Sequence, residues 1–230
     1  MGFLKRIFRS SAPEEQAIVG SAEGFERLTD EELQTHMGID RYDSFYLTNA
    51  IRPSYDLQIV PKQGFRHDEY RDDANGFVVP VLMAAATRKG LMDLFLDLLD
   101  PLGPVVDVVL ESSHQAGSRD QDLYREHIDI PVLKSTLLDF EDLLLNDGCT
   151  GIAVLNPRMR QEVQFDEHKM LIAYGQPLTQ FENILIAADV YPDPKLRFIT
   201  EAEHIHCSSE KYLDQFESLK SRLGMDANWR

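Results

Sequence analysis

The amino-acid sequence predicts an α/β or α+β fold, in which a mixed β-sheet is packed by amphipathic helices within a single globular domain. Short apolar segments typical of strands alternate with segments whose apolar residues recur at helical spacing. Three times a predicted helix is followed by a predicted strand, at 88–110, 133–155 and 180–200. Because 43% of the 230 residues are hydrophobic, the chain can also build a substantial core.

Capping residues and apolar spacing locate the helices. Thr29 and Glu32 form a capping box that predicts a helix over about 30–37, ending at Gly38. The helix expected over 88–100 has apolar side chains on one face and aspartates on the other. Further amphipathic helices are expected to begin near residues 133, 179 and 208.

Strands are expected where β-branched and aromatic residues lie between turn signals. They are predicted at 45–48, 57–60, 77–85, 105–110, 151–155, 162–165, 170–174 and 196–200. A hairpin turn is predicted at 166–169, and the stretches 66–76 and 112–126 are interpreted as charged or polar loops. Strands joined through helices favour parallel pairs and hairpins add antiparallel pairs, so the predicted sheet contains both.

The chain divides into three predicted regions. Residues 1–24 are interpreted as a flexible basic N-terminal tail and linker, because the first ten residues contain three basic side chains and no acidic one. Residues 25–224 form the single domain of the prediction, and residues 225–230 form a C-terminal tail.

Charge and cysteine content narrow the classes of partner. With 23 Lys+Arg against 39 Asp+Glu, the formal net charge is -16, so the surface repels phosphate backbones and nucleic acid is not expected as a partner. No apolar stretch approaches 18 residues without a charge, so no integral membrane association is expected either. Cys149 and Cys207 are expected to be reduced thiols, which indicates a cytoplasmic protein.

The motifs of several large enzyme classes are missing from the sequence. It contains no phosphate-binding loop, no dinucleotide-binding glycine motif, no nucleophile elbow and no zinc-protease helix motif. No catalytic residue is therefore assigned. Candidate binding residues come instead from two short segments rich in chemically active side chains.

The first segment contains two histidines separated by one residue. Alternate residues of a strand share a face, so His204 and His206 are expected to point the same way and to offer two ligands to one metal ion. A third ligand must come from elsewhere, and His114 is the candidate. Glu111 or Glu203 is then the candidate base, with zinc as the divalent metal. The plainer interpretation is a polar strand surface that binds no metal.

The second segment, Glu111–His114, follows a predicted strand. In open α/β sheets ligands gather beyond the carboxyl ends of strands, so Glu111, Ser113 and His114 are predicted binding residues. Ser112 or Ser113 beside His114 also suggests nucleophilic catalysis, but the sequence identifies no acid that would orient the histidine.

These features predict a non-catalytic intracellular domain that binds or regulates another protein and needs no cofactor. The prediction depends on the acidity, the regular order of helices and strands, and the missing catalytic motifs. The alternative is a metal-dependent hydrolase that uses the His204–His206 pair and a divalent ion such as zinc. Whether the chain is an enzyme is left open by the sequence, and so is its oligomeric state.

Overall fold

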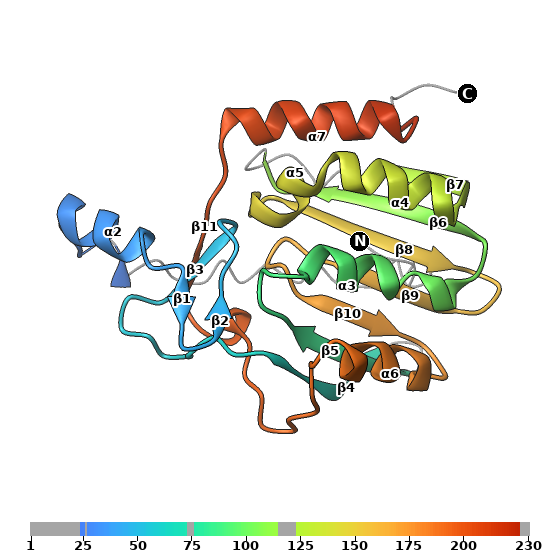
Figure 1. The fold of residues 1–230 in the computed structure, drawn as a ribbon, viewed down its shortest axis with the longest axis horizontal. Coiled ribbons are helices and arrows are strands. Elements are labelled where there is room, and N and C mark those ends of the chain that lie inside the picture. The colour runs from blue at the N-terminus through green and yellow to red at the C-terminus, as the bar shows by residue number, and fades with distance from the viewer. Residues whose placement is uncertain (1–23, 26, 73–75, 115–122, 226–230) are drawn as a thin grey trace.

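The computed structural model describes residues 24–25, 27–72, 76–114 and 123–225. Within them the chain forms a seven-stranded sheet with helices packed on it, which confirms the predicted fold class in its α+β form (Figure 1). The two predicted tails lie outside the described residues, apart from Gly24 and Met225. In the described part of the chain, no helix is both long enough and apolar enough to cross a bilayer.

The large sheet is antiparallel. In spatial order its strands are β4 (Gly64–Asp72), β5 (Phe77–Ala85), β10 (Leu171–Tyr174), β9 (Gln161–Phe165), β8 (Thr150–Asn156), β6 (Val105–Ser112) and β7 (Leu123–Asp129). Every ladder among them is antiparallel, so the predicted parallel pairs are wrong. The physical reason is the route of the chain. The helical connections from β5 to β6 and from β7 to β8 pass over at least one strand, so they never join neighbours.

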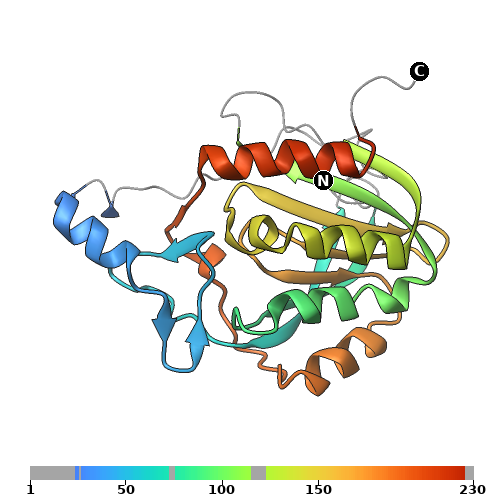
Figure 2. The ribbon, with the colours of Figure 1, turned by 45° about the horizontal axis from the view of Figure 1, so that its top comes forward.

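Five helices pack against one face of this sheet (Figures 1 and 2). They are α3 (Leu91–Asp97), α4 (Ile130–Asp139), α5 (Glu141–Asn146), α6 (Thr179–Ala187) and α7 (Glu210–Arg222). The helix α2 (Asp30–Met37) stands apart from them, and the capping box between Thr29 and Glu32 that the sequence predicts is formed at its start.

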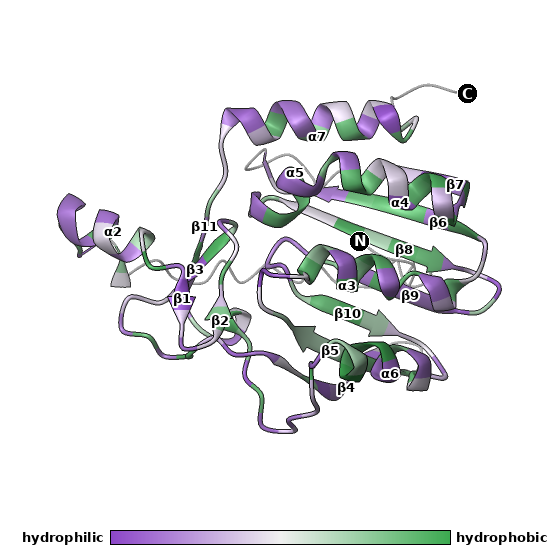
Figure 3. Cartoon of the chain, in the orientation of Figure 1, coloured by the Kyte–Doolittle hydropathy of each residue, from purple (hydrophilic) through white to green (hydrophobic). Residues whose placement is uncertain are grey.

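The core lies between the sheet and these helices. On β9, Val163 and Phe165 face the helices, and the rings of Phe95 and Phe165 lie 5.0 Å apart. The hydropathy of the ribbon follows the same division, with apolar central strands and polar outer helix faces (Figure 3). A smaller apolar cluster that includes Phe198 covers part of the opposite face. Alternate residues of the central strands are therefore buried on the two faces of the sheet, and this burial stabilises the sheet that carries the connecting loops.

A small lobe lies beside one end of the large sheet. It contains β1 (Arg41–Tyr42), β2 (Phe45–Tyr46), β3 (Ile51–Pro53) and β11 (His204–His206). The strand β11 pairs with β3 in an antiparallel ladder, with Ile205 opposite Arg52. Cys207 N donates to Ala50 O at 2.7 Å, and Gly148 N donates to Cys207 O at 2.8 Å. These bonds attach β11 to the segment that precedes β8.

Four local predictions are wrong, and the edge strands explain two of them. The charged stretch 66–76 belongs mostly to β4, and part of the polar stretch 112–126 belongs to β7. Both strands lie at the edges of the sheet, where charged side chains reach solvent while the backbone still pairs on one side. No strand forms at 57–60, and 196–200 ends in the short helix η3 (Ile199–Glu201).

Candidate metal centre

Three histidine rings meet beside the small lobe. His168 comes from the turn between β9 and β10, whereas His204 and His206 are the two ends of β11. The ring centroids are 5.1 Å apart for His168 and His204, 4.7 Å for His168 and His206, and 5.1 Å for His204 and His206. One ring nitrogen from each residue lies within 4.8 Å of those of the other two. We call these three residues the histidine cluster.

Each ring of the histidine cluster is oriented through its Nδ1 atom. His206 Nδ1 lies 2.5 Å from Gly148 O, and His204 Nδ1 lies 2.8 Å from Ala202 O. A carbonyl oxygen can only accept, so both Nδ1 atoms carry the proton and donate it. His168 Nδ1 donates in the same way to Asp166 Oδ2 at 3.0 Å. In the neutral rings the lone pair is therefore on Nε2, the arrangement that metal-ligating histidines adopt.

The spacing of the three rings fits a single ion. For a tetrahedral ion with metal–nitrogen bonds near 2 Å, the centroids of ligating imidazoles would be about 5.2 Å apart. The three separations observed here, 4.7 Å to 5.1 Å, are close to that value. All three residues are partly exposed, so solvent reaches the histidine cluster.

Asp166 influences the protonation of the His168 ring, to which it is hydrogen-bonded. Burial acts to lower the pKa of His168, but the hydrogen bond and the charge of Asp166 outweigh burial and raise it. Burial likewise acts to raise the pKa of Asp166, yet the bond and charge of His168 hold it below the ordinary value. Asp166 is therefore an ionised acceptor at neutral pH. Burial is the main cause that lowers the pKa of His204.

The turn that carries His168 is anchored at both of its ends. Asp166 Oδ1 accepts from Met170 N at 2.8 Å, and Lys169 N donates to Asp166 O at 3.0 Å. The buried Lys169 has a positive φ of 65° and donates from Nζ to Thr150 O at 2.8 Å. Burial lowers the pKa of Lys169 to about 8. The turn is thus attached to β8, the strand that follows Gly148.

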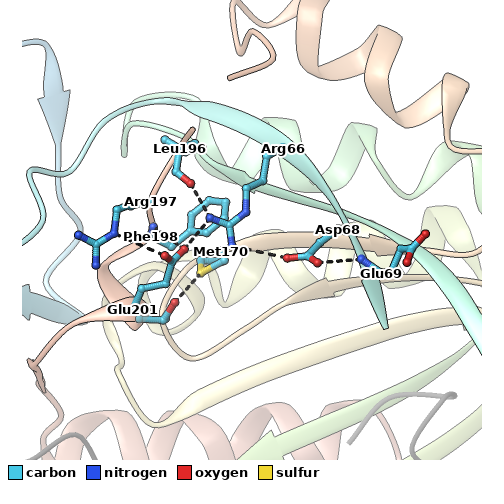
Figure 4. Close-up of polar contacts among 9 residues, drawn as sticks. Arg66, Asp68, Glu69, Met170, Leu196, Arg197, Phe198 and Glu201 are labelled. Atoms are coloured by element: carbon cyan, nitrogen blue, oxygen red, sulfur yellow. Dashed lines mark hydrogen bonds and ion pairs between the residues drawn. The ribbon is translucent and has the colours of Figure 1, made fainter. Parts of the chain in front are cut away.

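A second anchor fixes the segment that leads into β11 (Figure 4). Arg66 on β4 donates to Leu196 O at 2.5 Å and to Glu201 Oε1 at 2.7 Å. Its guanidinium group also lies 4.8 Å from the ring centroid of Phe198. Because Glu201 ends η3 just before β11, these contacts determine where the chain enters the strand that carries His204.

A narrow cavity adjoins His168. Its lining is mostly apolar and includes Leu47, Ile51 and Phe198, together with the hydroxyl-bearing Thr48. The space that it offers to water-sized molecules is ≈ 40 Å³. A buried water needs about 10–15 Å³ on this measure, so the cavity holds a few waters or a small apolar group.

The structure brings together some of the residues predicted from the sequence and separates others. His204 and His206 share a face, but His114 lies outside the histidine cluster, and His168 occupies the third position. His114 is held elsewhere because its Nδ1 lies 2.7 Å from Ser112 Oγ and its Nε2 lies 3.0 Å from Asp147 Oδ2.

The predicted acids and Ser113 also have other roles. Ser113 Oγ donates to Glu167 Oε2 at 2.7 Å, and Glu203 Oε1 accepts from Gly24 N at 2.9 Å. Glu111 lies on β6, opposite Gly151 of β8. Sequence reasoning missed Glu167 and His168. The hairpin turn predicted at 166–169 was the available signal for these two residues, because it places Glu167 and His168 in one turn.

Comparison of the chain with protein-family models, with curated proteins and with solved structures finds no match. A functional argument for this chain therefore depends on the geometry and chemistry of the site, because fold alone does not specify activity.

Proposed function

We propose that the chain is a metal-dependent hydrolase that binds a divalent ion, zinc above all, through the Nε2 atoms of His168, His204 and His206. The observation that carries the proposal is the orientation of the rings. Each Nδ1 donates to an oxygen, which leaves the lone pair of the neutral ring on Nε2, and one ring nitrogen of each histidine lies within 4.8 Å of those of the other two. Imidazole nitrogen suits zinc, and three protein ligands with an open fourth position are typical of catalytic zinc.

The bound ion would supply an activated water, because zinc lowers the pKa of its water to about 7. We assign the carboxylate of Glu167 as the general base. It follows Asp166 in the turn, and its charge acts to raise the pKa of His168 and His204, although burial still keeps the pKa of His204 below its ordinary value. Ser113 holds its carboxylate. Glu203, a candidate base from the sequence, is instead bonded to the backbone of Gly24.

The cavity beside His168 suggests the kind of group that the substrate carries. Its walls are mostly apolar, and its volume of ≈ 40 Å³ suits a group of a few heavy atoms. We therefore expect a substrate whose scissile bond lies at the ion and whose small apolar substituent enters the cavity.

Metal content tests the proposal. Purified chelator-free protein is loaded with zinc. The zinc content per chain is then measured for the parent, for His168→Ala and for the His204→Ala, His206→Ala double variant. We expect both variants to lose about one equivalent per chain relative to the parent. The control is His67→Ala, because this exposed histidine lies on the edge strand β4. Equal zinc content in the parent and both cluster variants would contradict the proposal.

Glu167→Gln separates metal binding from catalysis. The variant should keep the zinc content of the parent but lose activity against chromogenic esters and phosphoesters by about 10²-fold or more, as expected for a general base. Full activity in this variant would exclude Glu167 as the base while leaving the metal centre intact.

The non-catalytic interaction domain predicted from the sequence remains the second candidate. The small volume and apolar lining of the cavity favour it, since most substrate sites are larger and contain several polar groups. In that case the zinc-loaded protein would bind metal and hydrolyse none of the test substrates. The cytoplasmic location and the protein partner likewise remain predictions.

A further inference from the structure

A second group of ligand-type side chains lies next to the histidine cluster. It consists of His114, which follows β6, and of Asp147 and Cys149, which flank Gly148 before β8. One possible ligand atom from each residue lies within 4.8 Å of those of the other two. The pairing of β6 with β8 brings them together, since Ser112 lies opposite Thr150. We call His114, Asp147 and Cys149 the buried cluster.

Two polar atoms of the buried cluster have no hydrogen-bond partner among the described residues. They are His114 Nε2 and Asp147 Oδ1. The side chain of His114 is 6% exposed and that of Asp147 is 0% exposed, so solvent does not satisfy these atoms freely. His114 Nε2 does lie 3.0 Å from Asp147 Oδ2, but without the alignment of a hydrogen bond. Buried polar atoms in proteins are nearly always paired, so this pair of atoms indicates a missing ligand.

The contacts of His114 are those of a ligating imidazole. Ser112 Oγ lies 2.7 Å from Nδ1 and also accepts from the backbone N of His114 at 3.4 Å. When Nδ1 donates to this hydroxyl, the Nε2 lone pair faces a carboxylate oxygen of Asp147. Two lone pairs at 3.0 Å repel each other unless a proton or a metal ion lies between them. Ligand atoms of a tetrahedral zinc ion would be about 3.3 Å apart.

A serine nucleophile is the competing explanation. Ser112, His114 and Asp147 form a chain of the residue types used in such catalysis. That mechanism needs an aligned hydrogen bond from the histidine to the acid, and the contact between His114 Nε2 and Asp147 lacks this alignment. The cavity beside His168 does not include Ser112 in its lining. The metal explanation accounts for both orphaned atoms, and the nucleophile explanation does not.

We propose that the buried cluster is a second zinc site, with His114 Nε2, a carboxylate oxygen of Asp147 and Cys149 Sγ as its three protein ligands. On binding, the thiol of Cys149 loses its proton to solvent and coordinates as thiolate. The ion joins the end of β6 to the start of β8. It also fixes Gly148, which lies between two of the ligands and whose carbonyl accepts from His206. The proposal does not depend on hydrolase activity.

Cobalt substitution distinguishes the two sites, because a thiolate ligand adds a near-ultraviolet charge-transfer band that imidazole and carboxylate ligands lack. In the full chain loaded with Co²⁺, we expect about two equivalents and a thiolate band. Cys149→Ser should remove the band and about one equivalent, whereas the control Cys207→Ser should keep both. A variant with His168, His204 and His206 all changed to Ala should keep the band and about one equivalent.

The outcomes are separable. One equivalent without a thiolate band in the parent overturns the buried site and leaves the histidine cluster intact. A band that survives in Cys149→Ser also overturns it.

If Cys149→Ser does not fold, the reactivity of the thiols in the parent protein provides a second test. Zinc should protect one thiol from a thiol reagent, and a chelator should expose that thiol. A reaction rate unchanged by zinc would overturn the proposal. His114→Gln should abolish the protection.

Discussion

The histidine cluster and the buried cluster contain similar side chains in different surroundings. The three rings of the histidine cluster are partly exposed, and backbone carbonyls orient two of them. In the buried cluster His114 and Asp147 are almost wholly enclosed, and hydroxyl groups surround them, including Thr150 Oγ1 at 2.5 Å from Asp147 Oδ2. Both clusters offer three protein ligands, so coordination number does not separate them, but the rings of the histidine cluster are easier for water and substrate to reach. The difference in exposure therefore favours the histidine cluster as the reactive site.

Gly148 lies between the two clusters and links their geometry. Its carbonyl accepts from His206 of the histidine cluster, and its chain neighbours are Asp147 and Cys149 of the buried cluster. Its N–H donates to Cys207 O at 2.8 Å. The clusters differ in exposure but share this backbone segment, so a change at Gly148 should affect both, whereas changes elsewhere should affect only one.

The largest effect is expected for Gly148→Ala. A Cβ atom there would overlap the Ala50 carbonyl oxygen and lie 2.9 Å from Cys207 N. Because backbone atoms cannot move aside cheaply, we expect a loss of about 3 kcal/mol in unfolding free energy. Denaturant unfolding and zinc content measure the outcome, and both sites should lose metal. The control is Gly151→Ala, whose Cβ would make ordinary contacts no closer than 3.4 Å. Zinc retention at both sites in Gly148→Ala would show that neither cluster depends on the backbone geometry at Gly148.

Asp147→Asn should come next in size and should act on the buried cluster alone. The substitution leaves Thr150 without its charged acceptor in a site where the Asp147 side chain is 0% exposed, and it removes a charged ligand of the proposed ion. Weakening a buried hydrogen bond to a charged group costs about 1.5–3 kcal/mol, so we expect a loss of about 2 kcal/mol in unfolding free energy. Chemical denaturation measures this loss. Zinc bound at the histidine cluster should persist under native conditions, and its complete loss there would contradict the comparison.

Asp166→Asn should act on the histidine cluster alone. Asparagine cannot supply the charge that orients His168 and raises its pKa. Loss of such a partner behind a ligating histidine typically lowers metal affinity 10–100-fold. Competition with a chromophoric chelator measures this change, and Asp68→Asn on the edge strand is the control. An altered thiolate band in the cobalt form would show that Asp166 also acts on the buried cluster.

The fold could be predicted from the sequence where strands are apolar. The segment predicted at 77–85 coincides with β5, and those at 105–110 and 151–155 lie within β6 and β8. The edge strands β4 and β7 were missed because their charged side chains carry no strand-like pattern, while ladder hydrogen bonds with a neighbour stabilise them. Strand direction was also missed, since it depends on which strands become neighbours.

Two of the three residues of the histidine cluster could be predicted from local spacing. The period of two along a strand predicts that His204 and His206 share a face, and they do. The third ring depends on long-range pairing. The ladder between β3 and β11 sets β11 beside the turn that holds His168, and no short sequence pattern encodes this contact. His114 was chosen instead, but Asp147, also distant in the sequence, holds it in the buried cluster.

The smallest effect is expected for Arg66→Ala, which loosens the chain entering β11 without touching a ligand. The variant loses the bonds to Leu196 O and Glu201 and the contact with the Phe198 ring. The arginine side chain is 21% exposed, so we expect a loss of about 1 kcal/mol in unfolding free energy.

Zinc affinity at the histidine cluster should fall less in Arg66→Ala than in Asp166→Asn, because η3 is displaced while all three Nδ1 bonds remain. Chelator competition measures this change, and Arg71→Ala, which removes an exposed pair with Glu69, is the control. The thiolate band of the cobalt form should be unchanged. If it changes, the buried cluster senses the position of β11, and the two sites are coupled through the hydrogen bonds at Gly148.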